Sequence, residues 1–157
     1  MEKYMLILFS YCGLSEINSY LKEKLNQGDQ LLVRAVMLEG VPRLFEHLIS
    51  DVGFLGEKVV SDVEESVVDI YQDNAKEYLA ELEELAAAKD FKIDEKLIEY
   101  QDLSSLKKEM KKSSLNGIFI NFSHNEFVSN QVKEGEIKDW IEKIKLPKAI
   151  FYDGKNN

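Results

Sequence analysis

The sequence predicts an α/β protein in which a five-stranded parallel sheet carries helices on both faces. Three observations lead to this fold class. Short, nearly continuous apolar runs alternate along the chain with longer segments in which apolar residues recur at helical spacing. The strand-like runs mostly lack the alternation of a half-exposed sheet, so both of their faces are expected to be covered. Strands that alternate with helices imply right-handed crossovers and parallel pairing.

The first part of the chain predicts two buried strands separated by a helix. Tyr4–Phe9 is an apolar run and forms the expected first strand. Leu14–Leu25 has apolar residues on one helical face, and Gly28 follows its end. Gln30–Leu38 is the second expected strand, and Arg34 within it requires either a less protected face or a partner for its charge.

The middle of the chain predicts an irregular connection and then a long helix. Glu39–Glu57 contains several glycines and could hold one short helix, Pro42–Ile49. Lys58–Lys89 carries an apolar stripe opposite a face rich in glutamate, so we expect a helix that lies on a sheet or on a partner. A coiled coil is the alternative, but the stripe stops short of a sustained heptad.

The last part predicts three more strands and two helices. Its first strand alternates imperfectly, which favours a position nearer the edge of the sheet. Residues 155–157 are expected to be frayed. The predicted elements are a strand at Ile93–Tyr100, a helix at Leu103–Met110, a strand around Ile118–Ile120, a helix from near Gly135 to Ile144 and a strand at Ala149–Tyr152.

Length and composition indicate one domain over residues 1–157. A chain of 157 residues with 45% hydrophobic content can bury a core without disulfides or metals. Its single Cys excludes an intrachain disulfide and, with two His, is too little for a structural zinc cluster, which suits the cytoplasm. The N-terminal apolar run is too short to span a bilayer and lacks a basic flank and a cleavage site, so no membrane association is expected.

The net charge of −9 would repel phosphate groups, so we expect no nucleic-acid partner. Four lysines nevertheless cluster beside Glu109 on a short amphipathic segment. We interpret them as the solvated face of a helix. They are Lys107, Lys108, Lys111 and Lys112.

A candidate binding crevice follows from the predicted topology. In open parallel sheets, ligands lie outside the carboxyl ends of the strands, where the strand order reverses. If the first and fourth strands are neighbours there, the crevice is lined by Ser10–Gly13 and Asn121–Glu126. The polar loop after the fourth strand has no glycine that would let its backbone approach phosphate closely. The candidate contact residues are Ser10, Tyr11, Asn121, Ser123, Asn125 and Gly135.

The order of these elements resembles the universal stress protein family over nearly the whole chain. The resemblance rests on architecture more than on motif. It implies a five-stranded α/β domain that is commonly a homodimer paired through its last strand, which here is Lys148–Tyr152.

The resemblance also implies where ATP would bind. ATP-binding members carry a glycine, two residues, a second glycine, nine residues, and a third glycine followed by Ser or Thr, after the fourth strand. On this chain these positions fall on Phe122, Asn125, Gly135 and Glu136, and only Gly135 matches. The acidic residue that those members place after the first strand is also missing, because Ser10 and Tyr11 stand there.

These departures disfavour ATP, and no cofactor is expected. Phe122 adds bulk where the backbone must approach phosphates, and a carboxylate at Glu136 would occupy the anion site of a helix N-terminus. The leading prediction is therefore a dimeric regulatory or interaction module of the universal stress protein type without catalytic turnover. The alternative is a nucleotide-binding stress protein, or slow nucleotide hydrolase, that uses an altered loop, since other backbone amides can also hold phosphate.

Other catalytic or metal sites receive little support. Cys12 and His124 could form a thiol–imidazole pair at the carboxyl ends of adjacent strands, but no third orienting group is evident. His47 beside Glu46 lacks further ligands at suitable spacing. The first strand is not followed by the carboxylates of a two-component receiver domain, and only Gly13 lies where a Rossmann site needs several glycines. We predict neither catalytic nor metal-binding residues.

Overall fold

The computed structural model describes residues 1–10, 13–37, 76–99, 103–122 and 134–156. They form one sheet with the strand order β3-β2-β1-β4-β5-β6. The first five strands are parallel, and β6 runs antiparallel to β5. The strands are β1 (Lys3–Leu8), β2 (Gln30–Met37), β3 (Lys92–Glu99), β4 (Gly117–Phe122), β5 (Lys148–Tyr152) and β6 (Lys155–Asn156).

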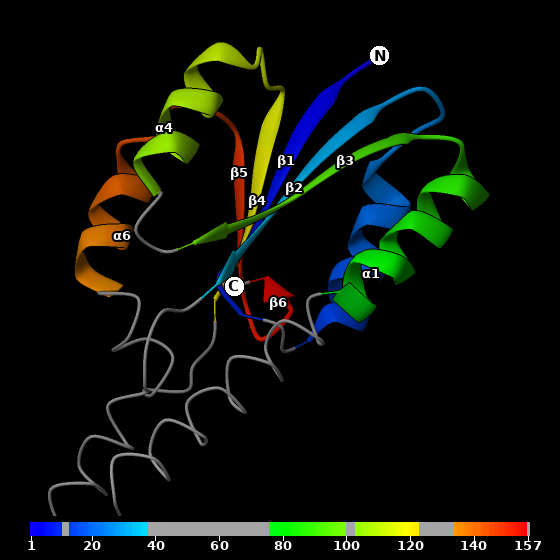
Figure 1. The fold of residues 1–157 in the computed structure, drawn as a ribbon, viewed down its shortest axis with the longest axis horizontal. Helices are drawn as coiled ribbons and strands as arrows, with labels where there is room; N and C mark the ends of the chain where they lie inside the picture. The colour runs from blue at the N-terminus through cyan, green and yellow to red at the C-terminus, as the bar shows by residue number, and fades with distance from the viewer. Residues whose placement is uncertain (11–12, 38–75, 100–102, 123–133, 157) are drawn as a thin grey trace, which may run out of the picture.

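Helices cover both faces of this sheet (Figure 1). On one face lie α1 (Leu14–Lys24) and the helical residues 76–89, and on the other lie α4 (Leu103–Lys112) and α6 (Glu134–Glu142). Successive residues of β1 enter the two layers in turn, since Leu6 packs with α1 and Ile7 packs with α4. The predicted fold class, a parallel α/β sheet covered on both faces, is confirmed.

The strand count differs from the prediction, because a short sixth strand follows the five predicted ones. Asp153 and Gly154 have φ values of 51° and 83°, which are the left-handed conformations that a two-residue hairpin turn requires. The turn brings Lys155 and Asn156 back along β5. The prediction that these two residues are frayed is therefore wrong.

Two further predictions about the elements are confirmed. β3 is an edge strand of the sheet, as its imperfect alternation indicated. The described part of the long helix, residues 76–89, packs Tyr78 and Leu82 into the core on the sheet. The rest of that predicted helix and the predicted connection before it lie outside the described residues.

Candidate functional site

The strand order places the predicted crevice between β1 and β4. β1 pairs with β4 in parallel, with Leu8 opposite Asn121, so the first and fourth strands are neighbours as expected. The chain continues from β1 toward β2 on one side and from β4 toward β5 on the other, and the strand order therefore reverses here. The carboxyl ends of these two strands are the first place to look for a ligand site.

Asn121 connects three segments at this position. Its side chain is 0% exposed. Nδ2 donates to the backbone oxygen of Ser10, 2.9 Å away, and Oδ1 accepts from the backbone N–H of Gly154 at 3.1 Å. Buried amides need such partners, because an unmade bond costs about 1–3 kcal/mol. Asn121 was predicted as a ligand contact, and the structure shows it bonded to the chain itself.

The turn before β6 lies directly against the start of α1. Gly13 caps that helix with a φ of 71°, and a Cβ at Gly13 would lie 1.8 Å from the backbone oxygen of Asp153. A Cβ at Gly154 would lie 2.1 Å from the oxygen of Gly13. The backbone N–H of Asp153 also donates to the oxygen of Phe122 at 2.9 Å. The turn thus spans from the end of β4 to the start of α1.

The N-terminus of α1 already holds a carboxylate from its own first turn. Ser15 Oγ donates to Glu16 Oε2 at 2.9 Å. Backbone hydrogen bonding at Glu16, together with this hydroxyl, lowers the pKa of the Glu16 carboxyl. Because a helix N-terminus attracts one negative group to its free N–H groups, Glu16 competes there with any phosphate.

The structure places three of the six predicted contact residues. Ser10 is buried just beyond β1, Asn121 lies in β4, and Gly135 is the second residue of α6, which begins where the sequence predicted. The others, Tyr11, Ser123 and Asn125, lie outside the described residues. So do the possible thiol–imidazole pair, Cys12 and His124, and the candidate ligands Glu46 and His47.

The closing turn, Asp153–Gly154, was missed in the sequence although a signal for it is present. Asp-Gly between Tyr152 and Lys155 is a strong sequence marker of a two-residue hairpin. The signal for Asn121 was equally local. A lone polar residue in a strand that is buried throughout must find hydrogen-bond partners inside the protein.

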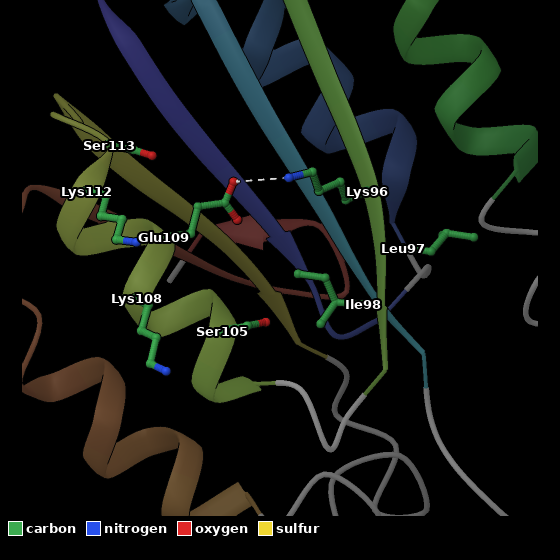
Figure 2. Close-up of a pocket in the computed structure, with 8 residues that line it drawn as sticks. All are labelled: Lys96, Leu97, Ile98, Ser105, Lys108, Glu109, Lys112 and Ser113. Carbon is green, nitrogen blue, oxygen red and sulfur yellow. Dashed lines mark ion pairs between the residues drawn. The ribbon is translucent and has the colours of Figure 1, made fainter.

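A second hollow lies away from this end, between edge strand β3 and helix α4 (Figure 2). It is a groove of about 620 Å³. Figure 2 shows Lys96 reaching from β3 toward Glu109 on α4, while Leu97 points to the other side of the strand. The lining residues are Lys96, Leu97, Ile98, Ser105, Lys108, Glu109, Lys112 and Ser113.

Arg34 lies beneath this groove and is 0% exposed. Its Nε donates to Glu109 Oε2 at 2.8 Å, Nη2 donates to Asp94 Oδ2 at 2.8 Å and to Glu109 Oε1, and Nη1 donates to the backbone oxygens of Val33 and Asp94 at 2.9 and 2.8 Å. All five guanidinium N–H groups are thereby bonded. The partner for the charge that the sequence required is present.

These ion pairs shift the pKa values of both partners. Burial acts to lower the pKa of Arg34, but the hydrogen bonds that it donates to Glu109 and Asp94 outweigh burial and raise it. The bond from Arg34 lowers the pKa of Glu109. Glu109 is therefore ionised, and its negative charge is directed to the buried arginine beneath the groove.

Metal sites and membrane-spanning helices each need a particular set of residues. Within the described ranges, no three His, Cys, Asp or Glu side chains are grouped so that they could hold a metal ion. In the same ranges, no helix is both long and apolar enough to cross a membrane.

Among the comparisons with known proteins, one likeness to a solved structure bears on the fold. No protein-family model matches the chain, and no curated protein sequence matches it. Among solved structures, the hypothetical protein MJ0577 is similar with a TM-score of 0.57 and 14% identity, over 97% of this chain and 96% of that one. The hypothetical protein PH0823 has a TM-score of 0.47 and 14% identity over the full length of both chains. The likeness to MJ0577 supports the α/β fold of this chain.

Proposed function

We propose that this protein is a regulatory or interaction module of the universal stress protein type, which acts through protein contacts and has no catalytic turnover. One observation carries the proposal. At the reversal point of the sheet, the C-terminal turn lies on Gly13 and hydrogen-bonds to Asn121. A fold that otherwise offers a ligand crevice here has its polar groups engaged by its own chain.

Charge supports the same conclusion. Glu16 occupies the first turn of α1 and Glu136 is the third residue of α6, and these are the first helices that the structure describes after β1 and β4. A triphosphate would approach two helix N-termini that each carry an acidic residue, in a chain of net charge −9. Electrostatic repulsion of the triphosphate would add to its steric exclusion by the C-terminal turn.

Calorimetric titration with ATP and Mg²⁺ tests the absence of nucleotide binding. We expect no saturable heat up to about 1 mM ligand, since that concentration corresponds to roughly −4 kcal/mol of binding free energy. Saturable binding in the micromolar range would overturn the proposal and favour a nucleotide-binding protein or slow hydrolase that uses an altered loop.

The module is proposed to be a homodimer that associates near β5. Half-buried apolar side chains gather along this side of the α4–α6 layer, among them Trp140, Ile144, Leu146 and Ile150. β6 pairs with the last two residues of β5, Phe151 and Tyr152, so the contact must use the earlier part of that strand and the neighbouring α6 segment.

Light scattering coupled to gel filtration measures the mass directly. We expect a dimer for the natural chain and a monomer for Ile144→Glu, because a charge would be buried in the contact. Lys145→Glu at the adjacent exposed position is the matched control and should remain dimeric. A monomeric natural chain would refute the homodimer and leave the nucleotide test unaffected.

A further inference from the structure

We propose that the groove between β3 and α4 binds an extended acidic peptide segment, which adds as a strand to the open edge of β3 and sets its carboxylates against the lysines of the groove. This inference deepens the proposed function, on which it rests, by naming the chemistry of the partner. Three features of the groove carry it: its charge, its strand edge and the different character of the two faces of that edge.

The groove is basic in an acidic protein. Lys96, Lys108 and Lys112 line it, and Arg34 lies beneath. The acidic groups next to them are Glu109 and Asp94, and both are bonded to Arg34. Lys96 Nζ lies 4.0 Å from Glu109 Oε1, at the limit of an ion pair. Arg34 and the three lysines carry four positive charges against the two carboxylates, so two positive charges are left in the groove to attract an anion.

Two of these lysines are one helical turn apart. Lys108 and Lys112 stand at positions i and i+4 of α4, and such residues share a face. Lys107 and Lys111 lie on the same helix but do not line the groove, and the Lys107 ammonium lies over the ring of Trp140, 5.7 Å from its centroid. The helix therefore divides its lysines between two surfaces.

The edge of β3 can accept another strand. The backbone N–H of Lys92 donates to the oxygen of Asp29, on the side of β2, at 2.8 Å. In a parallel ladder, alternate residues bond to the same neighbour, so the backbone groups of Ile93, Glu95 and Leu97 face the outer edge. Among the residues that the structure describes, no strand pairs with this edge. Extended peptides bind such edges by main-chain hydrogen bonds.

The two faces of β3 carry different side chains, so a peptide that adds to its edge must alternate between two kinds of side chain. On the groove face stand three lysines and Ser105, which suit carboxylates, and Glu109, which is bonded to Arg34. On the other face Leu97 is 44% exposed and suits an apolar side chain. Glu95 lies on that face as well and offers no positive charge to an acidic residue. Successive side chains of an added strand point to opposite faces, so acidic and apolar residues must alternate.

Fluorescence anisotropy tests the proposal with a labelled peptide of alternating Glu and Val, roughly ten residues long so that it spans an ordinary strand. We expect saturable binding to the full chain in buffer of physiological ionic strength. The double variant Lys108→Glu with Lys112→Glu should weaken binding by at least about tenfold. The matched control, Lys107→Glu with Lys111→Glu, changes the same charge on the same helix and should weaken it by no more than about threefold, because exposed charges are screened beyond about 8 Å.

A second peptide separates strand addition from simple charge attraction. With N-methyl groups on alternate residues along the edge that faces β3, it keeps every side chain and loses the main-chain donors, and it should bind at least about tenfold more weakly. The protein is unchanged in this comparison, so folding defects cannot explain the result.

Two outcomes would overturn the inference. One is no binding of the alternating peptide up to about 1 mM. The other is that the N-methylated peptide binds as tightly as the unmodified peptide, or that the two double lysine variants lose the same affinity for it. Either result would indicate a diffuse electrostatic attraction. Neither depends on the nucleotide titration, so a failure here leaves the absence of ATP binding intact, and nucleotide binding would not by itself remove the groove.

Discussion

Polar groups are bonded differently in two regions of the molecule. One region is the carboxyl end of β1 and β4, and the other is the groove beside β3. At the first, Asn121 and the backbone of Gly154 bond to each other, and two glycines allow backbone to meet backbone. At the second, Arg34 takes both neighbouring carboxylates, and the surrounding lysines remain exposed to solvent. At a fold's usual ligand position the polar groups can thus be bonded within the chain, while at an edge strand charged side chains stay exposed to solvent.

Removal of the Arg34 side chain should lower the free energy of unfolding the most, because Arg34 connects β2, β3 and α4 beneath the groove. Arg34→Ala leaves Asp94 and Glu109 facing each other above an unfilled space, and we expect a loss of about 3–4 kcal/mol in the free energy of unfolding. Urea denaturation followed by circular dichroism measures it. The control Lys96→Ala, at a 60% exposed side chain, should cost no more than about 0.5 kcal/mol. Equal costs for the two variants would mean that Arg34 does not hold this side together.

Gly154→Ala should disrupt the packing of the Asp153–Gly154 turn on the start of α1. Its Cβ would collide with the backbone oxygen of Gly13, and its φ of 83° is unfavourable for alanine. We expect a loss of about 3 kcal/mol by the same denaturation measurement. Gly28→Ala is a matched control, since Gly28 has a φ of 85° but no atom within 4 Å of the added Cβ, and it should cost only about 1 kcal/mol. If both substitutions cost the same, the turn does not pack closely on α1.

Asn121→Ala should destabilise the same region of the fold by removing hydrogen bonds, with no steric clash. Ser10 and Gly154 lose the bonds that Asn121 makes to them, and we expect a cost of about 2 kcal/mol. Asn116→Ala removes an exposed amide that accepts from the backbone N–H of Lys3, and it should cost less than about 1 kcal/mol. A smaller cost at Asn121 than at Asn116 would contradict the assigned network.

The smallest effect should come from Glu95, on the face of β3 opposite the groove lysines. Burial, with Glu83 nearby, raises the pKa of Glu95 to about 7. The folded state thus holds this proton more tightly than the unfolded state, and the resulting stability is complete below the usual pKa and lost as pH rises through about 7. Glu95→Gln should match the natural chain at pH ~3.5, below the usual pKa, and be more stable by about 1 kcal/mol at pH ~8, less than the full shift implies because solvent reaches the carboxyl.

Thermal unfolding at the two pH values measures this difference. Glu84→Gln, at an exposed position on the helix that carries Glu83, is the control and should change stability equally at both. A Glu95→Gln variant that gains nothing near pH 8 would show that the carboxyl is not perturbed.

Much of the fold was predictable because its strands are local apolar runs. The edge position of β3 followed from its alternation, and the charge of Arg34 required a partner that the structure provides. The hairpin was also locally encoded, but the Asp153–Gly154 turn was overlooked and residues 155–157 after it were expected to be frayed. In these cases the relevant physical chemistry lies within a few neighbouring residues.

The sites were harder to predict because they depend on distant segments. Nothing near Gly13 in the sequence indicates that Gly154 packs against it. Likewise, Lys108 and Lys112 were interpreted as a solvated helix face, and they are exposed as expected. Only the crossover that places α4 beside β3 brings Lys96 to them and forms a basic groove.

Amide hydrogen exchange at Gly154, followed by nuclear magnetic resonance, tests the central claim most directly. Its N–H donates to the buried Asn121 side chain, so we expect exchange at least about a hundredfold slower than in an unstructured peptide. Addition of ATP and Mg²⁺ should leave that rate unchanged. Exchange at the unstructured rate, or a change in protection on adding the nucleotide, would contradict the account of an end closed by the chain itself.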